Sequence, residues 1–257
     1  MFIPAFSYPG GKVRLRKWLH YYVPISGRMY IEPFAGRANL FWLVAQWHKF
    51  DRWILNDIRT WRFFHALKRI DINEIPDCWA TQQFMDECAL NPDSDLAQVI
   101  APRFTYCGGG WWNRAASKSL NSRSYSSETY KKHVSEAKRL LEKTQTEIYA
   151  FDVKDLFEHL PELTDQDFMY LDPPYINIKE TVSYGNADVD YDWLISFLRA
   201  TKCRWLLSDY ENHKYLSAFG EPIARKAVKC IMSGGGHNVK YKAEKPGRVE
   251  CLWANPG

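Results

Sequence analysis

The stretch with the strongest chemical character is MYLDPPY, residues 169–175, where a hydrophobic run ends at an aspartate, two prolines and a tyrosine. The run DFMYL is typical of a buried strand, and the prolines cannot continue it because neither has an N–H for the ladder. We therefore expect Asp172 and Tyr175 at the carboxyl edge of a sheet, where open α/β sheets bind ligands. The plainer alternative is that Asp-Pro-Pro only ends a strand and begins a turn.

This segment has the groups needed to activate a planar exocyclic amine, such as N6 of adenine. The lone pair of that nitrogen is delocalised into the ring, so the amine is a poor nucleophile. The Asp172 carboxylate and the Pro173 carbonyl could accept both N–H hydrogens and draw the nitrogen towards a tetrahedral shape. Tyr175 could stack on the ring, and a sulfonium methyl group would need only in-line positioning. Neither a metal ion nor a covalent nucleophile is needed.

A single-glycine turn, EPFAG at residues 32–36, connects an expected strand to an expected helix. Gly36 would let a ligand approach the backbone, and the helix N-terminus would offer free N–H groups. The full dinucleotide fingerprint G-x-G-x-x-G is absent, which argues against a nicotinamide enzyme. Taken alone, the turn is more simply explained as a plain connection.

Asn56 and Asp57 end the second expected strand. An acidic residue about 20 positions after the glycine turn can accept hydrogen bonds from both hydroxyls of a ribose. Asp57 would serve equally well as the N-cap of the helix that follows. The glycine turn favours the ribose role.

A glycine pair near the N-terminus, in YPGGK at residues 8–12, predicts a tight turn that can wrap a small ligand. Lys12 would place a positive charge near the carboxylate of that ligand, and Tyr8 could stack on a flat group. A surface turn ahead of a basic helix is the alternative.

The elements expected around these motifs alternate between strands and helices, which predicts βαβ units and a largely parallel sheet. Two C-terminal segments are expected to form a hairpin. The alternation breaks between residues 71 and 146, where only one segment has clear helical spacing. The expected strands are 28–36, 52–57, 147–152, 167–172 and 204–210; the helices are 39–50, 58–70, 128–143, 153–160 and 191–202, with an amphipathic helix inside 7–23; the hairpin joins 223–232 to 248–255.

Together these motifs resemble the DNA adenine-N6 methyltransferases of the deoxyadenosine-methylase type, the DPPY family with alpha motif order. In that family an F-x-G-x-G loop precedes the target-recognition region and D-P-P-Y follows it, and the same order occurs here. The resemblance extends over nearly the whole chain, through YPGGK, EPFAG, ILND, DVKDLF, YLDPPY, LLSDY and ECLWAN. One position departs from the pattern, because Ala38 stands where the loop has its second glycine, and this bears on cofactor affinity.

The resemblance implies an α/β fold with a Rossmann-like, S-adenosylmethionine-dependent methyltransferase core, in which the sheet is mixed and mostly parallel. Residues 1–70 and 147–257 would form this catalytic core. Residues 71–146 would form an inserted, mainly helical or irregular DNA-recognition domain. The target sequence cannot be transferred from the family.

The resemblance also assigns roles to individual residues. Asp57 would hold the ribose of S-adenosylmethionine and Asp155 its adenine amine, while Phe34 lines the methionine part of the pocket. The expected catalytic residues are Asp172, Pro173, Pro174 and Tyr175. The expected cofactor-binding residues are Tyr8, Gly10, Gly11, Lys12, Glu32, Phe34, Gly36, Asn56, Asp57, Asp155 and Asp172.

The 71–146 region has a basic and aromatic segment. Between Arg103 and Arg139, Lys and Arg residues are opposed only by Glu128 and Glu136. Such groups, interleaved with Ser and Asn, suit phosphate contacts and base readout. A solvated helix face with a small satellite core is the alternative. The expected DNA-binding residues are Arg103, Trp111, Trp112, Asn113, Arg114, Lys118, Arg123 and Tyr125.

We therefore expect transfer of a methyl group from S-adenosylmethionine to N6 of a flipped adenine in double-stranded DNA. Methylation of cytosine N4 or of RNA adenine would use the same amine chemistry, and a catalytically inactive DNA-binding homologue is a further alternative. A protein glutamine methyltransferase usually has Asn in place of Asp172 and lacks the basic insertion.

Composition agrees with these expectations. The formal charge of +4 is compatible with a polyanionic partner. No C-x-x-C pair, signal peptide or long apolar stretch occurs, which predicts a cytoplasmic protein with reduced thiols, no metal and no membrane association. The sequence leaves the oligomeric state open between a monomer and a weak dimer.

Overall fold

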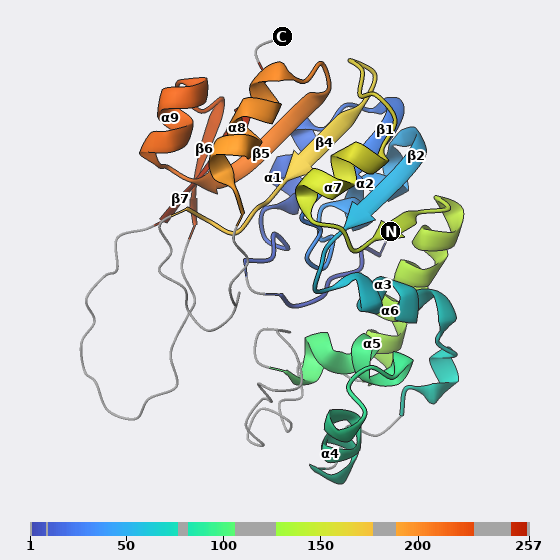
Figure 1. Ribbon diagram of the computed structural model, residues 1–257. Helices are drawn as coiled ribbons and strands as arrows, with labels where there is room; N and C mark the ends of the chain where they lie inside the picture. Colours follow the sequence, from blue (N-terminus) through green and yellow to red (C-terminus); the bar gives the residue numbers. More distant parts are fainter. Residues whose placement is uncertain are drawn as a thin grey trace, which may run out of the picture.

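The computed structural model describes residues 2–8, 10–76, 82–105, 127–176, 189–228 and 248–255 (Figure 1). Its centre is a seven-stranded sheet in the order β3-β2-β1-β4-β5-β7-β6. Neighbouring strands are parallel, except that β7 is antiparallel to both β5 and β6. The strands are β1 (Ser26–Glu32), β2 (Lys49–Asn56), β3 (Glu147–Tyr149), β4 (Phe168–Leu171), β5 (Arg204–Tyr210), β6 (Ala224–Val228) and β7 (Arg248–Ala254). The expected mixed, mostly parallel sheet and the expected C-terminal strand pair are confirmed.

The strand order creates the crevice in which a ligand can bind. β1 pairs with β2 on one side and with β4 on the other, so the chain changes direction across the sheet between β1 and β4. Parallel strands place their carboxyl ends at the same edge, and ligands bind at such a switch point. Glu32 ends β1, Asn56 ends β2 and Leu171 ends β4, so EPFAG, Asn56–Asp57 and the DPPY segment lie at this edge.

Two hydrophobic clusters cover the two faces of the sheet, because successive strand residues point to opposite faces. Tyr30 and Leu55 belong to the cluster that includes residues of α2, α3, α5 and α6. Met29 and Ile54 belong to the cluster beneath α7, α8 and α9 (Figure 1). The helices are α1 (Arg16–Leu19), α2 (Phe41–Trp47), α3 (Trp61–Arg69), α4 (Gln82–Leu90), α5 (Asp95–Phe104), α6 (Ser127–Lys143), α7 (Val153–His159), α8 (Tyr191–Ala200) and α9 (His213–Phe219), with 3₁₀ turns at His20–Tyr22 and Ile72–Glu74.

Several expected helix boundaries are corrected. The expected N-terminal amphipathic helix is only the four-residue α1 followed by a 3₁₀ turn. The helix expected at 58–70 begins at Trp61, because residues 57–60 form a turn held by the Asp57 carboxylate. The helix expected at 39–50 is confined to α2, since Lys49 already belongs to β2.

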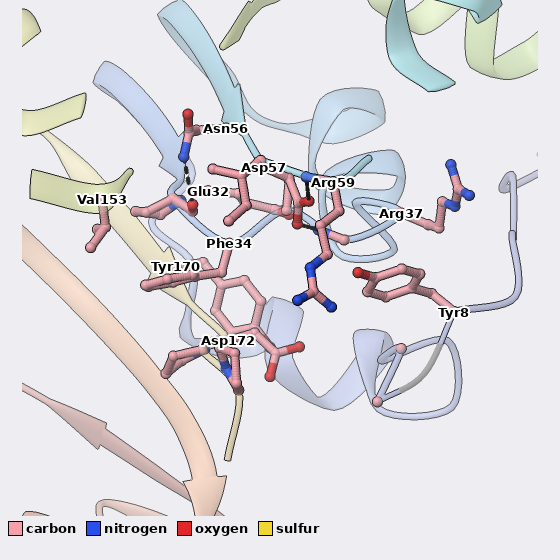
Figure 2. A pocket seen from close by; sticks show the side chains of 18 of the residues that line it. Tyr8, Glu32, Phe34, Arg37, Asn56, Asp57, Arg59, Val153, Tyr170 and Asp172 are labelled. Atoms are coloured by element: carbon pink, nitrogen blue, oxygen red, sulfur yellow. Dashed lines mark hydrogen bonds between the residues drawn. The ribbon is translucent and has the colours of Figure 1, made fainter. Parts of the chain in front are cut away.

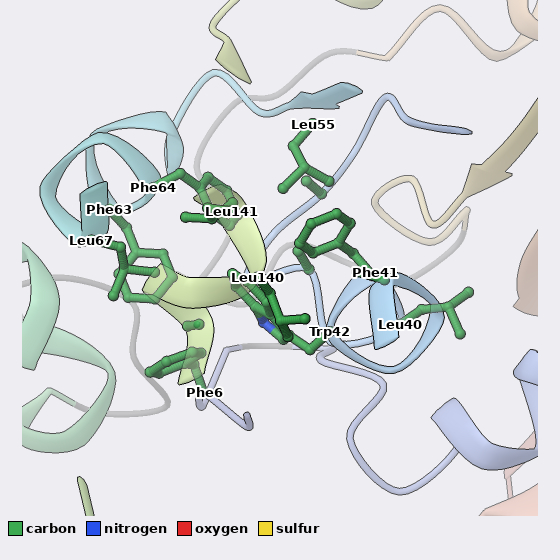
Figure 3. Packing of buried hydrophobic residues seen from close by; sticks show 14 of the residues in the cluster. Phe6, Leu40, Phe41, Trp42, Leu55, Phe63, Phe64, Leu67, Leu140 and Leu141 are labelled. Atoms are coloured by element: carbon green, nitrogen blue, oxygen red, sulfur yellow. The ribbon is translucent and has the colours of Figure 1, made fainter. Parts of the chain in front are cut away.

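The described part of the 71–146 region contains three helices, of which only α6 was expected. α5 begins at an N-cap that the sequence displays, since the Ser94 hydroxyl accepts a hydrogen bond from the Ala97 N–H at 3.2 Å. The Tyr130 hydroxyl of α6 donates to the Val99 carbonyl of α5 at 2.6 Å. Leu140 of α6 belongs to the same cluster as α2 and α3 (Figure 3). α5 and α6 thus extend the helical layer of the core, and a separate recognition domain stays a prediction.

None of the helices in the described ranges combines the length and the apolar character needed to cross a membrane.

Leu140→Ala tests whether α6 is part of the catalytic core. The Leu140 side chain is fully buried against α2 and α3, so its truncation should lower the free energy of unfolding by about 2–5 kcal/mol. Urea denaturation followed by tryptophan fluorescence measures the change. Glu142→Ala, on the exposed face of the same helix, is the matched control and should have little effect. A loss from Leu140→Ala as small as the control would mean that α6 contributes no core packing.

Candidate active site

A cavity of about 370 Å³ lies at the carboxyl ends of β1, β2 and β4 (Figure 2). The four motifs found in the sequence form its wall. Every expected cofactor-binding residue except Asp155 lines it, and so do the four expected catalytic residues. Segments separated by as many as 160 residues therefore meet at one edge of the sheet, as Lys12 and Asp172 do.

The YPGGK segment folds as a tight turn over the cavity. The Gly11 N–H donates to the Tyr8 carbonyl at 3.0 Å. A Cβ atom on Gly11 would lie 3.0 Å from that same oxygen, which explains the small residue. Gly10 has a φ of 71°, a left-handed conformation that glycine adopts freely.

Backbone conformation in the loop after β1 explains its small residues. Gly36 has a φ of 53° and lies directly beneath the Tyr8 ring, since a Cβ on Gly36 would be 2.9 Å from Tyr8 Cδ1. Ala38, the departure from the family pattern, has a φ of 51° and is fully buried. Ala38 therefore adopts the left-handed conformation that glycine favours, although it carries a Cβ atom.

The Asp57 carboxylate holds two backbone segments at once. Oδ2 accepts a hydrogen bond from the Gly36 N–H at 2.9 Å, while Oδ1 accepts from the N–H groups of Arg59 and Thr60 at 2.9 and 2.8 Å. Asp57 thus holds the turn before α3, whose N-cap is Thr60, so the expected capping of the helix by Asp57 is not found. Oδ2 accepts one N–H in these bonds, so its second lone pair could accept a hydrogen bond from a ribose hydroxyl. Asp57 also lines the cavity, and the ribose role stays a prediction.

Asn56 lines the cavity, but its amide has a structural task. Nδ2 donates to the Pro33 and Phe151 carbonyls, each at 3.0 Å, and Oδ1 accepts from the Phe151 N–H at 2.8 Å. One side chain thus ties the ends of β1 and β2 to the turn after β3. Asn56 thus has a positioning role, and its direct contact with the cofactor stays a prediction.

Asp155, expected to hold the adenine amine of the cofactor, does not line the cavity. Asp152 is the N-cap of this helix, because its side chain accepts from the Lys154 N–H at 2.9 Å. Asp155 therefore lies in the first turn of α7, where it is exposed and outside the cavity lining. Phe151, Asp152 and Val153 line the cavity at this point instead.

Beside the DPPY segment lies a buried group of charged side chains. Lys12 Nζ is 2.5 Å from Asp172 Oδ1 and 3.5 Å from Glu250 Oε1, and it also donates to the Gly10 carbonyl at 3.1 Å. The Tyr175 hydroxyl donates to Glu250 Oε1 at 2.7 Å. Lys12 thus contacts the expected catalytic carboxylate directly, which differs from the expected contact with a ligand carboxylate. Glu250 was not singled out in the sequence, although it begins the ECLWAN motif.

Two buried carboxyl groups at this edge have raised proton affinities. Burial raises the pKa of Asp172 to about 6, with Lys12 opposing the increase. Burial raises the pKa of Glu32 to about 8, and this group accepts a hydrogen bond from the Tyr30 hydroxyl at 2.6 Å. At neutral pH, Asp172 is therefore mostly a carboxylate and can accept hydrogen bonds, whereas Glu32 is mostly protonated.

Neighbouring elements fix the two-proline segment from outside. The Tyr191 hydroxyl at the start of α8 donates to the Pro174 carbonyl. Asp209 Oδ2 at the end of β5 accepts from the Ile176 N–H at 3.3 Å. Because the Pro174 carbonyl is engaged by Tyr191, the Pro173 carbonyl is the one that can pair with Asp172 as a second acceptor.

Three cavity residues were not predicted from the sequence, because each lies just after a recognised motif and not within it. Ile58 is 51% exposed and lines the cavity directly after Asp57. The Arg59 side chain points into the cavity between Asp57 and Asp172 (Figure 2). Arg37 is buried, with Cζ 4.2 Å from the Phe63 ring centroid. Their positions in the sequence, directly after EPFAG and after Asn56–Asp57, could have indicated that they line the cavity.

Of the expected DNA-binding residues, the structure describes Arg103, in the last turn of α5. The other seven, Trp111, Trp112, Asn113, Arg114, Lys118, Arg123 and Tyr125, lie outside the described residues.

Gly36→Ala should lower the free energy of unfolding by more than the left-handed penalty of about 1–2 kcal/mol. Gly36 has a φ of 53°, and the added methyl group would also press on the Tyr8 ring, 2.9 Å from Cδ1. Urea denaturation measures the free energy of unfolding. A loss no larger than the backbone penalty would show that the Tyr8 ring moves aside without cost.

Ala38→Gly should change the free energy of unfolding by less than about 1 kcal/mol. Relief of the left-handed strain, about 1–2 kcal/mol, offsets loss of a buried methyl group and the greater flexibility of glycine. Ala45→Gly, at a fully buried position within α2, lacks that relief and should cost more. An Ala38→Gly loss as large as that of Ala45→Gly would show that Ala38 carries no strain.

The comparisons with known proteins agree with this geometry. Residues 8–87 match the family model described as D12 class N6 adenine-specific DNA methyltransferase. The match covers YPGGK, EPFAG and Asn56–Asp57, while the DPPY segment lies beyond it. Among curated proteins, none matches the chain. Over residues 8–87 the chain is thus similar to the D12 class of N6 adenine-specific DNA methyltransferases.

Proposed function

We propose that the cavity binds S-adenosylmethionine and that Asp172–Tyr175 receive the N6 amine of an adenine flipped out of double-stranded DNA. The observation that carries this proposal is the convergence of YPGGK, EPFAG, Asp57 and the DPPY segment on one cavity. The match of residues 8–87 to the D12 family model supports adenine methylation of DNA as the reaction.

Cofactor binding is assigned to the part of the cavity near β1 and β2. Asp57 Oδ2 accepts from a ribose hydroxyl with its second lone pair. Ile58 and Val153 offer apolar contact to the adenine ring. Arg59 pairs with the carboxylate of the methionine moiety, because Lys12 is held by Asp172 and Glu250.

The chemical step is assigned to Asp172 and Pro173. When bound, S-adenosylmethionine supplies a sulfonium methyl group, whose S–C bond breaks with the electron pair left on sulfur. The Asp172 carboxylate and the Pro173 carbonyl accept the two amine hydrogens and free the N6 lone pair, which forms the new N–C bond. One amine proton leaves to Asp172. The raised pKa of about 6 makes this carboxylate a better proton acceptor than an exposed aspartate.

DNA docking is assigned to the basic segment from Arg103 to Arg139. Arg103 at the end of α5 and the basic face of α6 flank residues 106–126, which carry most of the expected contacts. Base flipping costs a few kcal/mol, which aromatic stacking of about 1–3 kcal/mol per base can offset.

The experiment compares Asp172→Asn with Arg59→Gln. Asp172→Asn should lower the single-turnover rate of methyl transfer to duplex DNA by at least roughly 100-fold, because an amide cannot take the proton. Its affinity for S-adenosylmethionine, measured by calorimetry, should stay close to that of the wild type. Arg59→Gln should weaken that affinity by roughly tenfold or more through loss of a charged hydrogen bond.

The product identifies the target base. Digestion of the methylated DNA to nucleosides and mass spectrometry should yield N6-methyldeoxyadenosine. N4-methyldeoxycytidine would keep the amine mechanism and overturn the adenine assignment. Normal turnover by Asp172→Asn would remove Asp172 from the chemical step.

A further inference from the structure

Glu250 is a buried carboxylate behind the catalytic segment. It lies on β7, opposite Tyr210 of β5 and Lys226 of β6 in the strand register. Its side chain is 3% exposed and does not line the cavity. Glu250 therefore contacts neither of the proposed ligands directly, and any effect on the reaction must pass through another residue.

One oxygen of Glu250 joins the two residues next to Asp172. Oε1 accepts from the Tyr175 hydroxyl at 2.7 Å and lies 3.5 Å from Lys12 Nζ. Lys12 Nζ also lies 4.7 Å from the centroid of the Tyr175 ring and 2.5 Å from Asp172 Oδ1. Two carboxylates thus share one ammonium, and the aromatic ring lies beside all three.

We propose that Glu250 is a positioning residue of methyl transfer, which fixes the Tyr175 ring and shares Lys12 with Asp172, so that Asp172 keeps its capacity to accept the amine proton. This inference rests on the proposed function. A carboxylate paired exclusively with a lysine is a weak proton acceptor, because the nearby positive charge favours its ionised form. A second carboxylate beside the same ammonium raises the proton affinity of the first again, because its negative charge opposes the positive charge of the lysine.

The groups around Asp172 support this direction. Lys12 lowers the pKa of Asp172, whereas the negative charge of Glu250 raises it. Glu32 and Asp209 have pKa values of about 8, so at neutral pH both are mostly protonated and carry little charge. The other titratable or polar groups near Asp172 include Arg59, which points into the cavity between Asp57 and Asp172, and Tyr8, Tyr170, Tyr175 and Ser208. Within the described residues, Glu250 is therefore the group whose charge most directly opposes that of Lys12.

Glu250→Gln separates charge from hydrogen bonding. The glutamine oxygen can still accept from the Tyr175 hydroxyl, while the negative charge is lost. Asp172 should then bind its proton more weakly, so the acid limb of the single-turnover rate should move to lower pH by roughly 0.5–1 unit. Above that limb the rate should fall roughly three- to tenfold. The Kd for S-adenosylmethionine should change by less than roughly threefold, because the Glu250 charge acts on the proton acceptor Asp172 and not on cofactor binding.

Glu211→Gln is the matched control. Glu211 is an exposed carboxylate paired with Arg225 at 3.0 Å. The control removes the same charge from a residue that is exposed and does not line the cavity, and its pH profile and rate should equal those of the wild type. If Glu250→Gln does not fold, Tyr175→Phe tests the contact, and its rate should fall at least threefold with the acid limb unmoved.

The outcomes separate the inference from the proposed function. A Glu250→Gln protein with the acid limb and rate of the wild type would overturn the positioning role while methyl transfer stands. So would a wild-type rate from Tyr175→Phe. A wild-type protein that binds S-adenosylmethionine and methylates no adenine would overturn the proposed function, and the role of Glu250 with it.

Discussion

The ammonium group of Lys12, buried between two carboxylates, is the interaction on which the catalytic edge depends. Lys12 is 4% exposed, and its partners Asp172 and Glu250 come from distant parts of the sequence. Removal of one member of a buried charge group leaves an uncompensated charge, which is strongly destabilising. The N-terminal turn, the end of β4 and the start of β7 must therefore come together for this edge to form.

The strand order makes this meeting possible. β4 lies at the centre of the sheet, β5 follows it, and β7 enters between β5 and β6 in the opposite direction. This reversal brings the beginning of β7, with Glu250, to the edge where β4 and β5 end. The YPGGK turn closes the same edge from outside and is held by Tyr8 on Gly36. The packing of Tyr8 on Gly36 and the ion pairs of Lys12 therefore both hold the YPGGK turn against this edge.

The sequence predicted the parts of this arrangement that depend on local patterns. Alternating strands and helices gave the mostly parallel sheet, and the spacing of EPFAG, Asn56–Asp57 and DPPY placed them at one edge. Contacts between distant residues could not be predicted this way. Nothing in the spacing of Glu250 points to Lys12, and the two uses of the Asp57 carboxylate depend on how the loop returns to Gly36. The role of Asp155 came from the resemblance: the helix expected at 153–160 does form, but its first turn leaves Asp155 exposed and outside the cavity lining.

The position of β7 has a consequence for the order in which the protein can fold during synthesis. β6 precedes β7 in the chain, yet its neighbour in the sheet is β7. A growing chain that has reached β6 has no partner for that strand, because the partner has not yet been translated. β5 likewise keeps a free edge until β7 arrives, and such unpaired edges favour pairing with other chains. The sheet thus stays incomplete until residues 248–254 have been added, and a chain that stops before that point would lack both β7 and Glu250.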